Sequence, residues 1–363
     1  MRILVGNPFG IGDVLFSLPL VRALRRAFPG GFLGFLSNCR TEELVGSWPE
    51  LNWNGVFEKD EFRKVWARSR GEGLRMLRRK VQMVKEQRFD LFLDLSLGWH
   101  YGLAAAFAGV PRRVGFNYRG RGRFLTHRLP LNGFDRQPVA ERYLDLLTLA
   151  GIARGPAPDG PMPLPAGIEE QVKRYCTQQA LPIAGKLVAL VPGGGTSWGP
   201  NARYKHWPAE RFAQVGDAIA RRGAQILVLG DRQEEPICRR VQEAMTERPR
   251  LAIQVPSLLL LAGILKRCAL VVGNDGGTLH LANAVGARTV SLFGPVDSTV
   301  YGPYPPRPIH RVVSLGLACR PCYRSFRFPP CPWDNRCLKD LPVEPVLEAA
   351  EALLNGRAGE VAG

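Results

Sequence analysis

Three glycine-containing segments carry the polar residues best suited to chemistry in this chain of 363 residues. The first is Gly10-Ile11-Gly12-Asp13-Val14-Leu15, which lies between a short apolar segment and apolar residues at helical spacing. A carboxylate on such a loop can act as a general base, so Asp13 is a catalytic candidate. The alternative is that Asp13 only caps the helix, a common role of aspartate. The glycine spacing does not match a dinucleotide-binding loop.

The second segment combines a glycine loop with a lysine. Residues 191–197 read VPGGGTS after an apolar run, and residues 204–208 read YKHWP. Glycines let backbone N–H groups approach a phosphate, Thr196 and Ser197 add hydroxyl donors, and Lys205 supplies a point charge suited to a diphosphate. A glycine-rich turn beside a surface lysine is the alternative. The segment lacks the G-K-[ST] ending of a P-loop, which argues against ATP hydrolysis of that kind.

The third segment, residues 273–280, reads GNDGGTLH and follows the apolar run 269–272. A strand, a glycine-rich turn and a helix start together predict an anion site at the helix N-terminus. His280 would lie in the first helical turn, where it could donate to a phosphate or fix the loop. A lone histidine is more often structural.

Alternating apolar segments and amphipathic helices must position these residues. We expect strands at residues 2–5, 32–36, 91–95, 114–116, 187–191, 225–229, 269–272 and 289–293. We expect helices at residues 14–28, 73–87, 139–150, 209–222, 257–267, 278–285 and 343–354. This alternation predicts parallel, doubly wound sheets.

A proline- and glycine-rich joint at residues 154–165 divides the chain, because so many prolines and glycines disfavour a helix or central strand. We expect a first domain at 1–160, a second domain at 161–342, and a C-terminal helix and tail at 343–363 that could pack back on the first domain. Ligands bind at the carboxyl ends of strands in such sheets. The cleft between two facing sheets is therefore the expected active site.

The formal net charge is +17. A charge of this size attracts polyanions such as nucleic acid, anionic lipid or phosphorylated substrates, but it does not indicate which of them binds. The alternative is a basic surface that only contacts solvent. No segment reaches the roughly 20 apolar residues that span a bilayer. Asp13 interrupts the apolar N-terminal stretch, so we interpret it as part of the folded protein rather than a signal peptide and expect a cytoplasmic location.

Four of the eight cysteines cluster near the C-terminus, at Cys319, Cys322, Cys331 and Cys337. Four thiols at short spacing suit a tetrahedral structural zinc site. Reduced thiols or occasional disulfides in a loop stiffened by proline are the alternative. We expect no catalytic role for them.

In this order and spacing, the segments resemble glycosyltransferase family 9, the ADP-heptose:lipopolysaccharide heptosyltransferases. The resemblance runs nearly end to end and includes the sequence LFGP at 292–295 and the cysteine cluster. It implies an α/β GT-B fold, in which two Rossmann-like doubly wound domains face a central cleft. The domain at 1–160 would bind the acceptor, and the domain at 161–342 would bind the nucleotide sugar. It also implies an inverting, metal-independent transfer.

The resemblance also implies roles for individual residues. Asp13 would be the catalytic base. The donor would be bound by Gly194, Thr196, Ser197, Lys205, Asp275, Gly276, Gly277, Thr278 and His280. The phosphorylated acceptor would suit basic residues of the N-terminal half, and our candidates with Gly12 are Arg63, Lys64, Arg119, Arg121 and Arg123. Some relatives hold the donor ribose with an acidic residue after the strand ending at Gly230, but here residues 231–235 read DRQEE and the matching carboxylate stays open.

The implied reaction moves heptose from ADP-heptose to the lipid A-linked inner core of lipopolysaccharide, with no cofactor required. No D-x-D metal motif lies near an expected strand end. We expect the enzyme at the anionic inner face of the inner membrane. One alternative is another nucleotide sugar or surface-polysaccharide acceptor within the same family. The other alternative is a non-enzymatic nucleic-acid-binding protein. The sequence lacks an RNP, KH or zinc-finger pattern, which argues against it.

Overall fold

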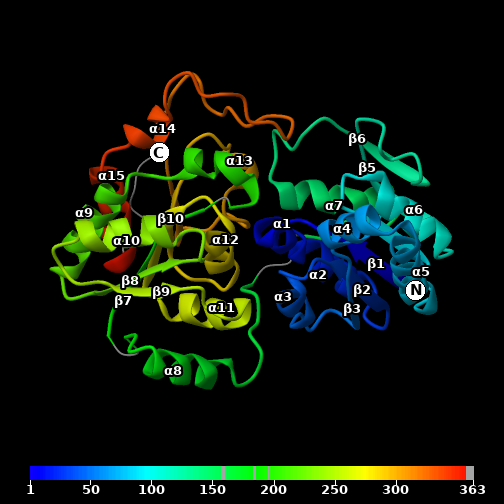
Figure 1. Ribbon diagram of the computed structural model, residues 1–363, viewed down its shortest axis with the longest axis horizontal. Coiled ribbons are helices and arrows are strands. Elements are labelled where there is room, and N and C mark those ends of the chain that lie inside the picture. Colours follow the sequence, from blue (N-terminus) through cyan, green and yellow to red (C-terminus); the bar gives the residue numbers. More distant parts are fainter. Residues whose placement is uncertain (157–159, 183–184, 195, 357–363) are drawn as a thin grey trace. The chain divides into compact units, whose positions relative to one another are not determined.

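The computed structural model describes residues 1–156, 160–182, 185–194 and 196–356, apart from the side chains of residues 59–60 and 196–197. The chain divides into two compact units, Met1–Asp159 and Gly160–Gly363. Each unit is built on a parallel six-stranded sheet, as the alternating pattern predicts (Figure 1). None of the described helices is both long enough and apolar enough to cross a membrane.

The sheet of the first unit has the strand order β3-β2-β1-β4-β5-β6. Its strands are β1 (Arg2–Gly6), β2 (Phe32–Ser37), β3 (Trp53–Val56), β4 (Leu91–Asp94), β5 (Arg112–Tyr118) and β6 (His127–Leu131). Its helices are α1 (Ile11–Phe16), α2 (Leu18–Ala27), α3 (Glu42–Gly46), α4 (Lys59–Arg68), α5 (Arg70–Glu86), α6 (Trp99–Phe107) and α7 (Val139–Leu149). The single helix expected at 14–28 is two helices, because Ser17 ends α1 just before Pro19 enters the first turn of α2.

The sheet of the second unit has the order β12-β11-β10-β7-β8-β9. Its strands are β7 (Leu187–Val191), β8 (Gln225–Gly230), β9 (Arg250–Ile253), β10 (Leu270–Asn274), β11 (Thr289–Leu292) and β12 (His310–Val313). Its helices are α8 (Ile168–Gln178), the 3-10 segment η1 (Thr196–Lys205), α9 (Ala209–Ala220), α10 (Glu235–Ala244), α11 (Leu258–Arg267), α12 (Gly277–Ala284), α13 (Ser298–Tyr301), α14 (Arg336–Lys339) and α15 (Glu344–Leu354).

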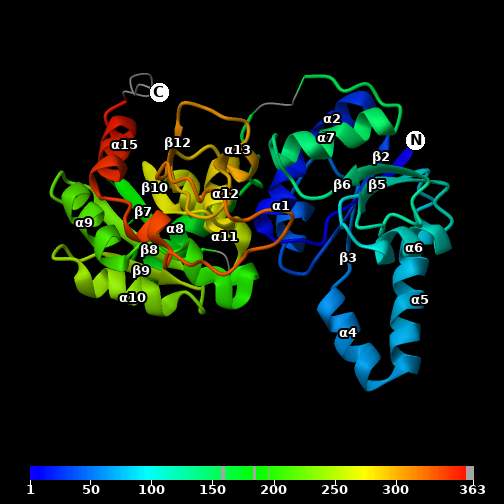
Figure 2. The same cartoon turned by 90° about the horizontal axis from the view of Figure 1, so that it is seen from above.

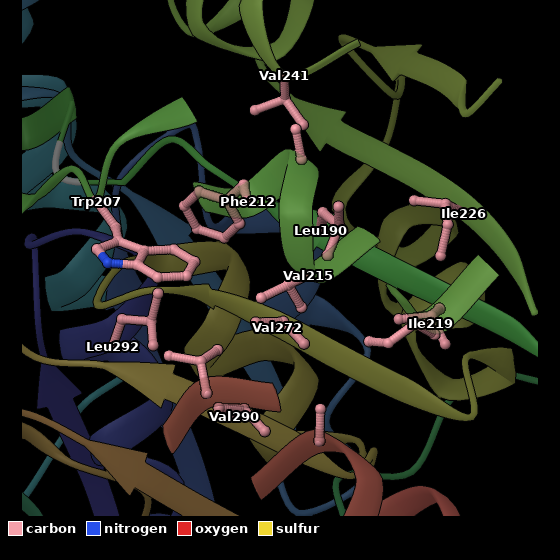
Figure 3. Packing of buried hydrophobic residues seen from close by; sticks show 14 of the residues in the cluster. Leu190, Trp207, Phe212, Val215, Ile219, Ile226, Val241, Val272, Val290 and Leu292 are labelled. Carbon is pink, nitrogen blue, oxygen red and sulfur yellow. The ribbon is translucent and has the colours of Figure 1, made fainter. Parts of the chain in front are cut away.

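The main core of the second unit lies between its sheet and the helices α9, α10 and α15. Leu190 of β7 and Val272 of β10 face Phe212 and Val215 of α9, beside the fully buried Trp207 (Figure 3). Trp207 also donates its indole N–H to the Leu341 carbonyl oxygen at 2.9 Å. This core fixes the β7 and β10 ends, from which the glycine-rich loops depart.

The C-terminal helix α15 belongs to this core. Val346, Ala350 and Leu353 are buried, and α15 packs against α9 and the strands β10 to β12. This differs from the expected separate segment that packs back on the first domain. The physical reason is the apolar face of α15, which covers one face of the second sheet.

Each sheet has a point at which the chain reverses its direction of winding. In the first unit this point lies between β1 and β4, and in the second between β7 and β10. Ligands of open parallel sheets bind at such switch points, beyond the carboxyl ends of the strands. The three segments singled out from the sequence follow β1, β7 and β10, so all three lie at switch points.

Candidate functional site

Two glycines after β7 bring the backbone close to neighbouring elements of the second unit. A side chain at Gly193 would overlap the carboxyl group of Glu234. Gly194 has φ +133°, and a β-carbon there would lie 3.0 Å from the Asp275 carbonyl oxygen. Only glycine fits this conformation without strain. The loop after β7 is thereby packed directly against the loop after β10.

Asn274, the last residue of β10, joins these loops by hydrogen bonds. Its side-chain nitrogen donates to the Pro192 carbonyl oxygen at 2.7 Å, and its side-chain oxygen accepts from the Trp207 backbone N–H at 3.1 Å. The side chain is fully buried. Asn274 therefore links both ends of the second sequence segment to the third, although we did not select it as a candidate from its sequence pattern.

The buried carboxylate of Asp275 contacts two basic side chains. Its Oδ2 lies 2.6 Å from Lys205 Nζ, and its Oδ1 lies 3.3 Å from His280 Nε2. All three side chains are at most 10% exposed. Burial alone would raise the pKa of Asp275, but the Lys205 charge and the His280 hydrogen bond outweigh it and lower that pKa to about 2.

Lys205 is not the exposed lysine of the alternative interpretation. It is buried at the end of η1, and its ammonium group lies 4.6 Å from the centre of the Trp198 ring. Trp198 in turn packs against Tyr323 and Phe328. The neighbouring His206 donates from Nε2 to the Gly194 carbonyl oxygen at 3.0 Å. Lys205 is thus held between an anion and an aromatic face beside the glycine loop.

The start of α12 supplies backbone donors next to this group. Gly276 is the extended N-cap residue, and Gly277 and Thr278 form the first turn. The first N–H groups of a helix have no partner within it. They can therefore bind an anion, as the third segment predicts. Among the other donor candidates, the side chains of Thr196 and Ser197 lie outside the described residues, so their roles stay predictions.

The carboxylates after β8 are now distinguished by their contacts. Glu234 Oε1 accepts from the Gly194 N–H at 2.6 Å and Oε2 accepts from the Asp231 N–H at 3.1 Å. Burial, and then the Asp231 charge, raise the pKa of Glu234. Asp231 caps the turn through the Gln233 and Glu234 N–H groups, and Glu235 pairs with Arg239. Among these three carboxylates, that of Glu234 therefore faces the glycine loop.

Asp13 lies in the first turn of α1, three residues after the N-cap Gly10. The N-cap interpretation of Asp13 is therefore wrong. Asn7 Nδ2 donates to the Asp13 backbone oxygen at 2.9 Å, and Asn7 Oδ1 accepts from the Phe9 N–H at 3.2 Å. The half-buried Asp13 and its neighbour Gly12 thus follow a loop that Asn7 fixes from within.

Two buried groups near the switch point of the first unit escaped the sequence analysis. Burial and the Asp13 charge raise the pKa of Tyr143, a residue of α7, well above its ordinary value. Asp94 ends β4 and accepts from the Ser96 N–H at 2.9 Å. Burial raises the pKa of Asp94 to about 6. A carboxylate at the end of an apolar run was the signal that could have identified Asp94.

The five basic acceptor candidates lie on two parts of the first unit. Arg63 and Lys64 are exposed on α4, whereas the other three occupy the exposed loop between β5 and β6. There the guanidinium groups of Arg119 and Arg121 lie over the Tyr118 ring, and that of Arg123 lies 4.8 Å from the Trp99 ring centre. Trp99 and Arg63 line one common cavity, whereas the other four candidates do not line it.

The four clustered cysteines are free thiols. Cys322 donates to the Cys319 carbonyl oxygen at 3.0 Å, and burial raises the pKa of Cys337 to about 11. Zinc requires thiolates at tetrahedral positions. No group of three or more histidine, cysteine or acidic side chains is arranged to hold a metal within the described part of the chain. The arrangement does not support the expected zinc site.

Comparison with known proteins agrees with the fold and identifies the family. The profile of glycosyltransferase family 9 (heptosyltransferase) matches residues 77–327. Lipopolysaccharide heptosyltransferase 2 of Escherichia coli strain K12 is 27% identical over 315 residues, which cover 81% of this chain and 83% of that protein.

Two solved structures share the architecture. The E. coli ADP-heptose LPS heptosyltransferase II has a TM-score of 0.77 at 22% identity and covers 98% of this chain and 99% of its own. The E. coli heptosyltransferase WaaC with ADP has a TM-score of 0.72 at 19% identity, and the match covers 97% of this chain and 100% of that chain. The two parallel sheets with their helices thus form a GT-B-like fold. The chain is a glycosyltransferase and belongs to glycosyltransferase family 9, the heptosyltransferase family.

Proposed function

We propose that this glycosyltransferase moves heptose from ADP-heptose to the phosphorylated inner core of lipopolysaccharide. The observation that carries the proposal is the group Lys205, Asp275 and His280 beside two glycine loops at a switch point. Support for the substrates comes from the E. coli relatives, one of which is named for lipopolysaccharide and another of which was solved with ADP.

On this proposal, the diphosphate of the donor meets Lys205 and the backbone N–H groups at the start of α12, whereas the Gly194 N–H stays bonded to Glu234 and its glycine lets the loop lie close to the diphosphate. Asp275 does not contact the phosphates, because two anions would repel each other. It instead holds Lys205 and His280 in position. Glu234 accepts a hydrogen bond from a ribose hydroxyl, because its carboxylate is the one beside the glycine loop.

The chemical step is a single displacement at the anomeric carbon. Asp13 takes the proton from the acceptor hydroxyl while the bond to ADP breaks on the opposite face, which inverts the anomeric centre. The leaving diphosphate gains charge, and Lys205 with the α12 N-terminus stabilises it. These groups supply the charge compensation, so the scheme requires no catalytic metal. The acceptor phosphates meet the arginines of the first unit, with the protein at the anionic inner face of the inner membrane.

The test is mass spectrometry of a purified core acceptor incubated with ADP-heptose and, separately, with a panel of other nucleotide sugars. We expect the acceptor to gain one heptose with ADP-heptose and to gain no sugar from the panel. A dephosphorylated acceptor serves as the control for the arginine contacts. A gain from another nucleotide sugar without a gain of heptose would contradict the proposal and favour the alternative within the family.

A further inference from the structure

The first unit contains an apolar cavity of about 450 Å³ among α4, α5 and α6. This volume lies within the range of roughly 300–1,000 Å³ that is usual for small-molecule sites. Figure 2 shows α4 and α5 as a helical hairpin that extends away from the sheet of the first unit. The cavity lies between this hairpin and α6, so it is separate from the loops that carry Asp13.

Aromatic rings form one wall of the cavity. Tyr101 packs edge-on against Phe57 at 5.4 Å, Phe57 contacts Phe62 at 5.9 Å, and Phe62 contacts Trp66 at 5.6 Å, measured between ring centres. All four residues line the cavity. Leu4 and Phe92, from the core of the sheet, lie at its base. The lining therefore favours a hydrocarbon ligand over a sugar or nucleotide.

Large apolar side chains are exposed around the cavity. Trp66 is 41% exposed and Phe107 is 68% exposed, and both line the cavity. Leu74, on α5, is 40% exposed. Exposed apolar groups that adjoin a cavity and have polar neighbours mark a surface that binds a membrane or a partner.

Positive charge surrounds the same features. The hairpin from Lys59 to Glu86 contains ten basic and four acidic residues. Arg63 and Lys80 line the cavity itself, and Arg123 lies over the ring of Trp99, which also lines it. Lys80 additionally donates to the Val56 carbonyl oxygen at 2.8 Å. A ligand that satisfies both features has a hydrocarbon chain and an anionic headgroup.

We infer that this cavity binds an acyl chain of an anionic phospholipid, so that the α4–α5 hairpin docks the protein on an anionic bilayer. The basic residues contact the headgroups, and the aromatic wall receives the chain. Helices with apolar and strongly basic faces bind anionic membranes in this way. The inference deepens the proposed function, since it supplies a site that holds the protein where a lipid-linked acceptor resides.

The test uses vesicles of phosphatidylcholine with or without phosphatidylglycerol, with bromine on the acyl chains. Flotation measures binding, and quenching of tryptophan fluorescence by bromine measures contact of Trp66 and Trp99 with the chains. We expect the wild type to float with the anionic vesicles, to remain unbound with the neutral vesicles, and to be quenched. Trp66→Phe should lose a distinct part of this quenching.

Ala104→Phe and Val81→Phe fill the cavity from two sides. Each should weaken binding to anionic vesicles about tenfold, the effect of losing roughly two buried methylene groups. Ala106→Phe is the matched control, because Ala106 is on the same helix but does not line the cavity. Arg63→Glu should reduce flotation with anionic vesicles.

Transfer to a water-soluble, deacylated core acceptor separates this inference from the proposed function. We expect Ala104→Phe to keep that transfer and its thermal unfolding midpoint while it loses vesicle binding. Unchanged vesicle binding in both filled variants, or binding without bromine quenching, would overturn the acyl-chain site. Equal binding to neutral and anionic vesicles would overturn the headgroup contact.

Discussion

The carboxylate of Asp275 contacts both Lys205, the proposed donor-binding lysine, and His280. Considered alone, Lys205 is a positive charge offered to a diphosphate. In the structure its charge is matched by the buried carboxylate of Asp275. The lysine therefore contributes to the fold as well as to the proposed binding site, and its removal must affect both.

Lys205→Ala should lower the free energy of unfolding by about 3–5 kcal/mol, because it leaves Asp275 buried without its cation. It should also raise the KM for the donor and lower kcat. The reason is that the lysine binds the charged diphosphate in the ground state and stabilises the additional negative charge that the leaving diphosphate gains in the transition state. Urea denaturation and steady-state kinetics measure the two effects.

The double variant Lys205→Ala/Asp275→Asn is the control that separates them. It removes the uncompensated charge and should recover part of the stability without recovering kcat. If Lys205→Ala changes the unfolding free energy by less than about 0.5 kcal/mol, as an ordinary surface substitution does, and leaves both kinetic constants near wild type, the assigned donor site is wrong.

Asp13→Asn keeps the shape of the side chain and removes its basicity. Transfer should fall by about 10²–10⁴, which is the usual contribution of a general base. Binding of ADP should stay close to wild type in calorimetry, because the proposed donor contacts belong to the second unit. Transfer that stays within about threefold of wild type would rule out Asp13 as the base.

The central strands of both sheets follow from the sequence, whereas four outer strands do not. Strands such as β7 and β10 are buried on both faces; β7 is a continuous apolar run, and β10 is apolar until it ends at Asn274. The unpredicted outer strands β3, β6, β9 and β12 have mixed composition. β6 contains Pro130, and in β3 Gly55 lies directly under the Trp53 ring. Proline and glycine are tolerated at sheet edges, and they interrupt the apolar pattern from which a strand is predicted.

The glycine loops of the candidate site could be selected from the sequence, but their contacts could not. The turn at Gly193–Gly194 and the start of α12 each have a local signature. The pairing of Lys205 with Asp275 joins residues far apart in sequence and depends on how η1 folds back toward β10. The same holds for Glu234, whose selection among neighbouring carboxylates depends on the approach of α10 to the β7 loop.

Asn274→Asp tests whether the two loops act as one element. The replacement places a carboxylate oxygen against the Pro192 carbonyl oxygen, where the amide now donates a hydrogen bond. Loss of a buried hydrogen bond costs about 1–3 kcal/mol, so we expect that decrease in unfolding free energy, together with weaker donor binding. Denaturation and ADP titration measure both quantities. Wild-type ADP affinity in this variant would show that Asn274 does not position the donor loops.

The whole molecule combines two doubly wound units with a formal net charge of +17. An excess of cations of this size attracts phosphorylated substrates over distances of about a Debye length, roughly 10 Å at 0.1 M salt. The composition predicted this attraction but could not identify the anion. The proposed function assigns Arg63, Arg119, Arg121 and Arg123 of the first unit to the phosphates of the acceptor.

Added salt should therefore raise the KM for the phosphorylated core acceptor while it leaves kcat nearly unchanged. Initial rates between low and physiological ionic strength measure this, with a dephosphorylated acceptor as the control. A KM that is independent of salt, or equal salt effects on both acceptors, would show that the acceptor phosphates do not contact these arginines.

The most direct test of the account follows ADP release and acceptor mass together, with ADP-heptose as donor and EDTA present, and determines the anomeric configuration of the product by NMR. The account predicts one ADP released for each heptose added, undiminished turnover in EDTA, and an inverted anomeric centre. ADP release without a gain of heptose, a rate that EDTA abolishes and magnesium restores, or a product with retained configuration would contradict it.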